Sequence, residues 1–179
     1  MDTVRKWLLR FLERPYIRLQ LTVVVLVDPR ENSALDTVKT ALESSKVFWL
    51  DLGIMLQPVV RGWQEVPDPH ASLGDNLHEL HRWSIGTPSP TIYVFNDATF
   101  LETGVLGLAW EHNGIAAVAG SSVPDINLDE LIDHELGHLL GLDHEDNTFM
   151  RATLELHNRV VTTVQRIVML RNAYGMGGF

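Results

Sequence analysis

The stretch from His134 to His144 constrains this chain more than any other, because it reads His-Glu-Leu-Gly-His-Leu-Leu-Gly-Leu-Asp-His. Its first two histidines, His134 and His138, lie four positions apart, and residues at that spacing share one face of an α-helix. Two imidazoles placed in this way can bind one zinc ion, each at roughly 2.0–2.1 Å. The spacing therefore predicts a helix that presents a metal-binding pair.

The other fixed positions of the stretch predict a catalytic site. Glu135 follows the first histidine by one residue, about 100° around the helix, so it lies beside the metal and can take a proton from a zinc-bound water. Gly141 permits the left-handed backbone that ends a helix. The turn after it lets His144 swing back as a third ligand. This leaves a fourth position open for water, which distinguishes a catalytic zinc from a structural one.

The residues around the stretch favour a helix over three unrelated histidines on a solvated segment. Pro124 and Asp125 break the preceding segment, and Asn127 with Glu130 suits a capping arrangement. An apolar stripe, offset from the histidine pair by roughly a third of a turn, is expected to face the core. Its members are Leu128, Ile132, Leu136 and Leu139.

These residues, together with Met150, resemble the metzincin clan of zinc peptidases, and the matrixin branch in particular. The resemblance implies that the three histidines bind catalytic zinc and that Glu135 is the general base and acid. It also implies that Met150 belongs to a Met-turn, which places an apolar thioether beneath the metal without ligating it. Glu145, directly after the third histidine, is similar to the astacin glutamate that pairs with the mature N-terminal ammonium. The branch within the clan therefore stays open.

The fold class that we predict is α+β. A metzincin-like single domain is expected, with a twisted, mostly parallel sheet, an antiparallel edge strand, and an active-site helix and a C-terminal helix that flank a cleft. Apolar runs predict strands at residues 18–27, 54–60, 91–96, 105–110 and 115–119. Helical periodicity predicts helices at residues 32–45 and from about residue 156, the second with Val160, Val161, Val164, Ile167 and Val168 along its apolar face.

The chain shows no interdomain linker, so we expect a catalytic domain at residues 18–179 after an N-terminal segment at residues 1–17. Pro15 would end an amphipathic helix in that segment. Its apolar stripe is Val4, Trp7, Leu8, Phe11 and Leu12. Three interpretations stay open for this helix: a docking helix that covers the domain, a removable pro-segment, and a membrane-surface anchor.

The strand between Val105 and Trp110 resembles the matrixin strand that forms the upper rim of the substrate cleft. An extended peptide can add to an exposed edge strand through backbone hydrogen bonds alone. We therefore expect a peptide or protein substrate to bind along this strand. His70, His78 and His81 lie in an upstream loop, where solvated histidines are more ordinary than a second zinc site.

Composition limits the partners. A net charge of −9 argues against nucleic-acid binding, which needs clustered Lys and Arg. The absence of cysteine excludes disulfides, a thiolate zinc site and a cysteine-based latency switch. We recognise no signal peptide, and the apolar run at residues 21–27 is too short for a transmembrane segment, so a cytoplasmic location is expected. The oligomeric state is left open.

Together these observations predict a zinc-dependent endopeptidase, which hydrolyses peptide bonds by a zinc-bound water that Glu135 activates. The alternative is a latent or non-catalytic regulatory or binding module that contains zinc. An intact Glu135 argues against the alternative, because a retired site has no physical need for a carboxylate beside the water.

Overall fold

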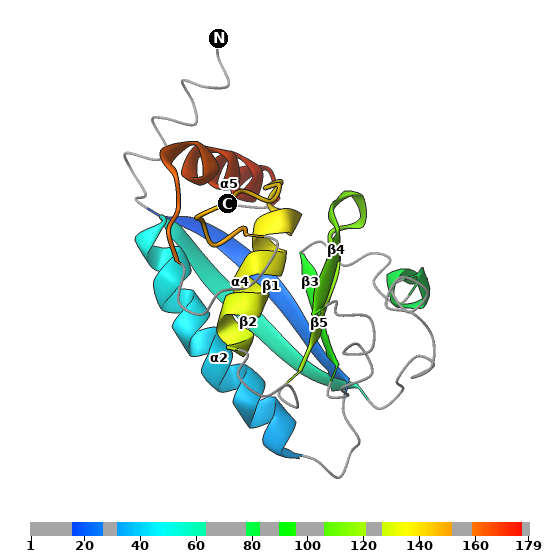
Figure 1. Ribbon diagram of the computed structural model, residues 1–179. Helices are drawn as coiled ribbons and strands as arrows, with labels where there is room; N and C mark the ends of the chain where they lie inside the picture. Colours follow the sequence, from blue (N-terminus) through cyan, green and yellow to red (C-terminus); the bar gives the residue numbers. More distant parts are fainter. Residues whose placement is uncertain are drawn as a thin grey trace.

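The structure, a computed structural model, describes residues 16–26, 32–63, 78–82, 90–95, 106–120, 127–151 and 159–176. Its strands are β1 (Ile17–Leu26), β2 (Ile54–Trp63), β3 (Thr91–Phe95), β4 (Gly107–Trp110) and β5 (Ile115–Ala119). Its helices are α2 (Asn32–Asp51), α4 (Leu128–Leu139) and α5 (Thr163–Gly175), and η2 (Glu111–Asn113) is a 3₁₀ turn. Figure 1 shows their arrangement.

The strands form one sheet in the order β2-β1-β3-β5-β4. β1 pairs in parallel with β2 and β3, and β3 pairs in parallel with β5. β4 alone runs antiparallel, to β5. The predicted mostly parallel sheet with an antiparallel edge strand is therefore confirmed. The continuous apolar runs of β3 and β5 are buried at every position, as expected for strands covered on both faces.

Two apolar clusters lie on opposite faces of this sheet. On one face, alternate residues of β1, such as Leu21 and Val23, pack against α2, α4 and α5. On the other face, Val24 and Tyr93 pack around Leu80, which belongs to a helical stretch at residues 78–82. The predicted apolar stripe of α4 is buried at all four positions. The larger cluster holds α4 against the sheet and thereby positions the histidine stretch.

Some local predictions differ from the structure. α2 continues to Asp51 rather than ending near Ser45, because Phe48 and Trp49 extend its buried face. Pro58 lies in β2, which is an edge strand as its missing N–H suggested. Asn127 occupies the N-cap position of α4, as expected, but its side chain makes no capping hydrogen bond.

The predicted C-terminal helix is present, but its buried face is not the expected one. A capping box starts α5: the Thr162 hydroxyl accepts a hydrogen bond from the Gln165 backbone N–H, and the Gln165 side chain accepts one from the Thr162 N–H. This start turns Gln165, Met169 and Ala173 inward. Val164 and Ile167, which were expected to face the core, are exposed.

None of the described helices is long and apolar enough to cross a membrane. The predicted N-terminal helix lies outside the described residues. Of the predicted segment at residues 1–17, only Tyr16 and the start of β1 are described.

Candidate metal centre

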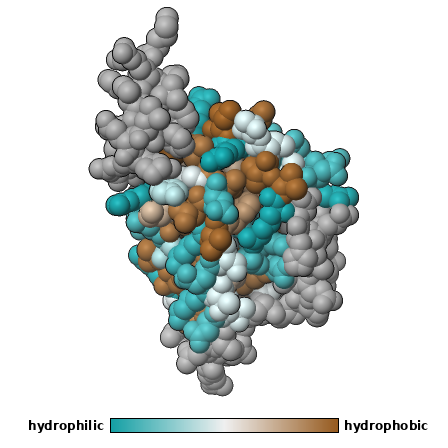
Figure 2. All heavy atoms as spheres, turned by 90° about the vertical axis from the view of Figure 1, so that its left-hand side faces the viewer, coloured by the Kyte–Doolittle hydropathy of each residue, from teal (hydrophilic) through white to brown (hydrophobic). Residues whose placement is uncertain are grey.

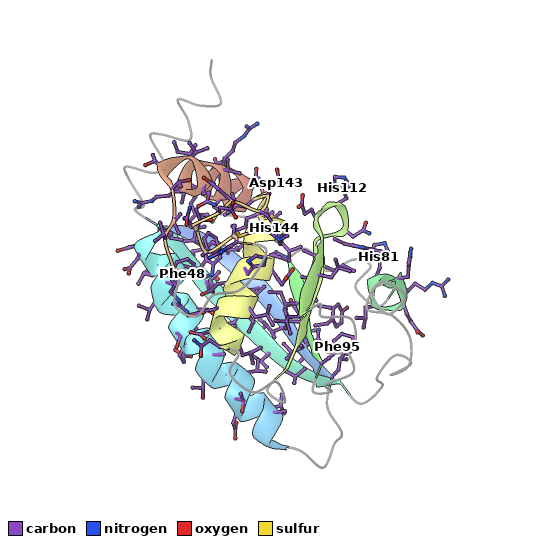
Figure 3. All side chains as sticks on the ribbon, viewed as in Figure 1. Phe48, His81, Phe95, His112, Asp143 and His144 are labelled. Atoms are coloured by element: carbon purple, nitrogen blue, oxygen red, sulfur yellow. The ribbon has the colours of Figure 1, made fainter. Side chains whose placement is uncertain are left out.

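The structure brings the three predicted histidine ligands together. The imidazoles of His134 and His138 lie one turn apart along α4 and meet edge to face, with their Nε2 atoms 3.2 Å from each other. His144, in the loop after the helix, returns so that its Nε2 lies 3.1 Å from that of His138 (Figure 3). The three ligand atoms all lie within 4.8 Å of one another. Three nitrogen atoms so placed can share one metal ion.

Backbone carbonyl oxygens orient the two helical imidazoles. His134 Nδ1 lies 3.0 Å from the carbonyl oxygen of Phe149, and His138 Nδ1 lies 2.7 Å from that of Leu142. Because a carbonyl only accepts, each Nδ1 carries the proton and each Nε2 keeps its lone pair. That tautomer is the one that binds a metal through Nε2.

The acidic residues after the helix do not orient the ligands. Asp143, Glu145 and Asp146, which surround His144 in the sequence, are all exposed. Backbone carbonyls take that role for His134 and His138.

The donor set fits a zinc ion. Nitrogen lone pairs about 3 Å apart repel one another unless a proton or a cation lies between them. Burial lowers the pKa of His134 to about 4, and burial also lowers the pKa of His138, so both are neutral near pH 7. Three imidazole ligands that leave a further position for water match the ligand sets of catalytic zinc. Within the described ranges, no other group of three potential ligands converges; His78 and His81 join none, and His70 lies outside these ranges.

Gly141 ends α4 as the sequence predicts. Its φ is +81°, and the helix closes with hydrogen bonds from Gly141 N–H to His138 O (2.8 Å) and from Leu142 N–H to Gly137 O (3.0 Å). The second bond fixes Leu142, whose carbonyl oxygen then holds His138. The turn therefore both returns the chain and orients a ligand.

Glu135 lies beside the three histidines and is buried. Its carboxylate packs so closely against Gly107 of β4 that a Cβ at position 107 would overlap with Glu135 Oε1. Burial raises the pKa of Glu135 to about 8. Sequence reasoning missed the part of Gly107; the signal was a glycine inside a predicted strand, which often marks a close approach.

Three solved structures share this architecture. Archaemetzincin from Methanopyrus kandleri has a TM-score of 0.58 and 18% identity, over 87% of this chain and 95% of that one. Metalloproteinase-II from Bacteroides fragilis has a TM-score of 0.57 and 15% identity, over 87% and 53%. A structure described as a chaperone-substrate complex has a TM-score of 0.64 and 16% identity, over 90% and 38%. The fold is metzincin-like.

At these identities, the likeness shows the fold alone. This chain spans only 38% and 53% of the length of two of the three structures. A scan against protein-family models finds no match, and a search of curated protein sequences finds none.

The turn that ends at Met150, which the sequence resemblance predicts to be a Met-turn, packs against α4. Met150 is fully buried, and its sulfur sits so close to Gly137, between the two helical histidines, that a Cβ there would overlap with it. The Glu145 N–H closes the turn by donating to the Met150 carbonyl oxygen at 3.0 Å. Asn147 adopts a φ of +61° within it. The Met150 thioether thus packs against α4 at Gly137, the residue directly before His138.

Thr148 anchors this turn to α5. Its hydroxyl donates to the Glu145 carbonyl oxygen at 2.8 Å. It accepts from the Met150 N–H at 3.1 Å and from Gln165 Nε2 at 3.1 Å. Gln165, in the first turn of α5, therefore also fixes the turn beside the metal ligands.

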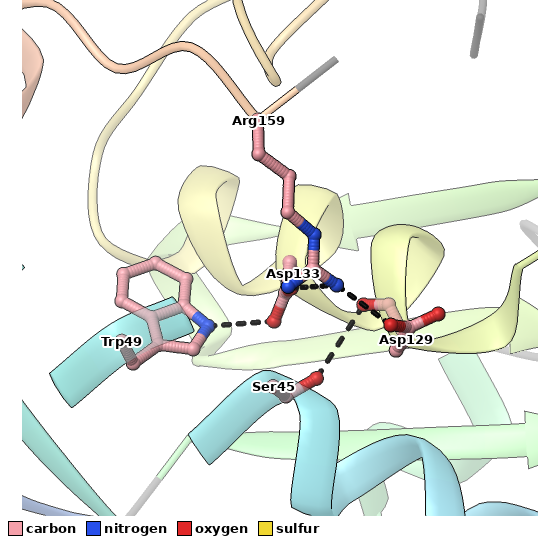
Figure 4. Close-up of polar contacts among 5 residues, drawn as sticks. All are labelled: Ser45, Trp49, Asp129, Asp133 and Arg159. Atoms are coloured by element: carbon pink, nitrogen blue, oxygen red, sulfur yellow. Dashed lines mark hydrogen bonds and ion pairs between the residues drawn. The ribbon is translucent and has the colours of Figure 1, made fainter. Parts of the chain in front are cut away.

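A buried polar cluster lies behind the metal-binding face of α4 (Figure 4). Trp49 Nε1 donates to Asp133 Oδ1 at 2.7 Å. Arg159 Nη2 donates to Asp129 Oδ2 at 2.6 Å and lies 3.3 Å from Asp133 Oδ2, an ion pair that is not aligned as a hydrogen bond. Burial raises the pKa of Asp133 to about 7, against the opposing effects of Arg159 and Trp49. Sequence reasoning missed this cluster.

Aromatic rings join the cluster to the ligand His134. The Arg159 guanidinium lies 5.1 Å from the ring centroid of Phe48. Phe48 and Trp49 both meet the ring of Phe149 edge-on, at 5.3 and 6.2 Å. Because the Phe149 carbonyl holds His134, the cluster supports one ligand from behind.

We predict that Gly137→Ala weakens zinc binding. The new Cβ would displace the Met150 sulfur, which cannot move away freely because it is fully buried. The dissociation constant for zinc should rise by roughly 10-fold or more, the effect typical of disturbed ligand support. Competition with a zinc indicator measures it. Gly175→Ala is the matched control, because a Cβ there meets nothing within 4 Å; equal zinc affinity in both variants would contradict the packing argument.

We predict that Arg159→Met destabilises the protein more than Lys39→Met. Removal of Arg159 leaves the buried Asp133 carboxyl without its cation, which should cost about 2–4 kcal/mol. Lys39 pairs with Asp36 at an exposed site, so its loss should cost less than about 1 kcal/mol. Urea unfolding of both variants tests this difference. Equal losses would mean that the buried pair contributes no more than a surface pair.

Proposed function

We propose that this chain is a zinc-dependent endopeptidase. The observation that carries the proposal is the convergence of three metal-binding nitrogen atoms beside the buried carboxyl of Glu135. The metzincin-like fold supports it, since two of the similar structures are described as an archaemetzincin and a metalloproteinase.

His134, His138 and His144 would hold the zinc. When bound, zinc supplies a Lewis acid that polarises the substrate carbonyl and lowers the pKa of water towards neutrality. Glu135 then accepts the proton of the attacking water and passes it to the leaving amine. Burial raises the pKa of Glu135 in the metal-free protein, and a neighbouring cation favours its carboxylate form.

Substrate would bind along the outer edge of β4, the last strand of the sheet on that side within the described residues. Ala119 N–H donates to Leu106 O across the β4–β5 pair, at 2.7 Å. The antiparallel register continues this bonding at every second residue, so the backbone N–H and C=O groups of Gly107 and Ala109 point to the open side. An extended peptide can bond to them as an added strand.

Gly107 would therefore serve the substrate and the general base together. Its backbone groups point to the open edge, while Glu135 packs against its Cα. A peptide bonded at Gly107 would lie close to the carboxyl that moves the proton. This coupling supports placing substrate here rather than on another edge.

The edge strand is the feature that resembles the matrixin branch, whereas a Met-turn is implied for the whole clan. Glu145, the astacin-like feature, uses its backbone N–H to close the Met-turn, and its side chain is exposed. A pairing of this side chain with an N-terminal ammonium would have to form at the surface. A cytoplasmic location stays a prediction from the sequence.

We predict that Glu135→Ala abolishes peptide hydrolysis but leaves zinc bound, because Glu135 moves the proton and the three histidines bind the metal. Metal analysis and cleavage of a peptide library, on wild type and variant, measure both properties. Glu130→Ala, on the same helix, is the control and should retain activity. Retained cleavage by Glu135→Ala would refute its role. Stoichiometric zinc in a wild type that cleaves nothing would favour the non-catalytic module.

We predict that Gly107→Ala lowers kcat/KM by roughly 100-fold with little change in zinc content. The new methyl group would push the Glu135 carboxyl from its position, and a displacement of about 1 Å can have this effect. Ala109→Gly, on the same strand, is the matched control and should lose much less. Full activity in Gly107→Ala would show that Glu135 does not depend on β4 for its position.

A further inference from the structure

An apolar surface on α5 lies open. Large apolar side chains that are exposed among the described residues include Val160, Val164 and Ile167, which follow one another on or directly before α5. Val164 is 71% exposed and Ile167 56%. We name these three residues the α5 apolar surface. Apolar residues also gather in the upper part of the face shown in Figure 2. Large apolar side chains that are exposed close together are a candidate contact surface.

The described chain begins next to this surface. The Ile17 N–H donates to Gly53 O at 2.9 Å, and Arg166 Nε, from α5, donates to Leu52 O at 3.1 Å. The turn at Leu52 and Gly53 thus joins the start of β1 to the first half of α5, and α5 also contacts β1 directly. Residues 1–15 therefore connect to the fold beside the α5 apolar surface.

We propose that residues 4–12 dock on the α5 apolar surface as an amphipathic helix. Their apolar side chains recur at helical spacing, as Val164 and Ile167 do on α5, so two apolar stripes can pack together. A nine-residue helix is about 14 Å long, enough to cover the surface. Leu12 is four residues before Tyr16, a reach of roughly 13 Å, and Pro15 lets the chain turn there.

The charges of the segment agree with this orientation. In such a helix Lys6 and Arg10 would lie on the face opposite Val4 and Leu8, and Arg5 would lie at the border of the apolar stripe. When the apolar stripe packs on α5, these basic side chains remain in water. Docking therefore buries no charge.

Docking here would support the metal centre from behind and leave the substrate edge open. α5 holds the end of α4, because Asn172 Nδ2 donates to Leu140 O at 2.8 Å. α5 also holds the Met-turn through Gln165 and Thr148. A segment that covers the outer side of α5 acts on these supports, whereas a pro-segment would have to occupy the substrate edge at β4.

Disulfide cross-linking of the full chain tests the proposal, because the natural sequence has no cysteine to interfere. The test pair is Leu8→Cys with Val164→Cys, oxidised with diamide at low protein concentration. We expect an intramolecular disulfide, seen as loss of two free thiols and faster migration of the monomer on a non-reducing gel. It should form about tenfold faster or more than in either control pair, because docking raises the effective concentration of the thiols.

The two control pairs separate docking from random encounters. Arg10→Cys with Val164→Cys places the thiol on the basic face, and Leu8→Cys with Lys39→Cys places the partner on the exposed face of α2. Equal rates in the test and control pairs would overturn the proposal. Disulfide-linked dimers that increase with protein concentration would assign the surface to a second copy and overturn it as well.

Two further measurements address the other occupants. Binding of the wild type to anionic lipid vesicles that is lost when residues 2–15 are deleted, combined with no disulfide in the test pair, would assign the segment to a membrane surface. A several-fold rise in peptidase activity on the same deletion would assign it to the substrate edge. Either result would overturn docking on α5. The cross-linking itself does not depend on activity, so its outcome stands whether or not the chain is a peptidase.

Discussion

Two hydrogen bonds, from the Nδ1 atoms of His134 and His138 to backbone carbonyl oxygens, are the interactions on which the metal centre depends. They fix the tautomer that turns both Nε2 lone pairs towards His144. Neither acceptor belongs to α4 itself: one is in the turn after Gly141 and the other is in the turn that ends at Met150. The site is therefore only as well ordered as those two turns. Thr148 contributes no ligand atom, but its hydrogen bonds hold the turn that contains Phe149 and thereby hold His134.

α5 is the common support of both turns. Asn172 caps the end of α4, and Gln165 reaches the Thr148 hydroxyl while it also caps its own helix. The position of α5 sets the position of both turns. The apolar contacts of α5 with the sheet come from its inner side. Additional cover on its outer side would reduce its motion, and the apolar stripe at Val164 and Ile167 offers the place for such cover.

The sequence predicts well what depends on local spacing. The histidine pair, the left-handed Gly141 and the buried stripe of α4 all follow from helix periodicity or from the backbone freedom of glycine. Contacts between distant segments were not predictable. Glu135 meets Gly107, and Asp133 meets Arg159 and Trp49, only in the assembled fold. The buried face of α5 was misjudged for a related reason: valines at helical spacing mark an apolar face, but they do not say what covers it.

Asp133 and Glu135 flank the same ligand and are both buried, yet their surroundings separate their roles. Asp133 has Trp49 and Arg159 as partners, which offset part of the cost of burying its carboxyl, so its contribution is structural. The side-chain carboxyl of Glu135 makes no hydrogen bond with any of the described residues, and burial is the cause of its raised pKa. An unpaired buried carboxyl destabilises a fold, so its presence here calls for a functional reason. Its place beside three converging imidazoles supplies that reason: a cation there would offset the burial, and the carboxyl would be ready to exchange a proton.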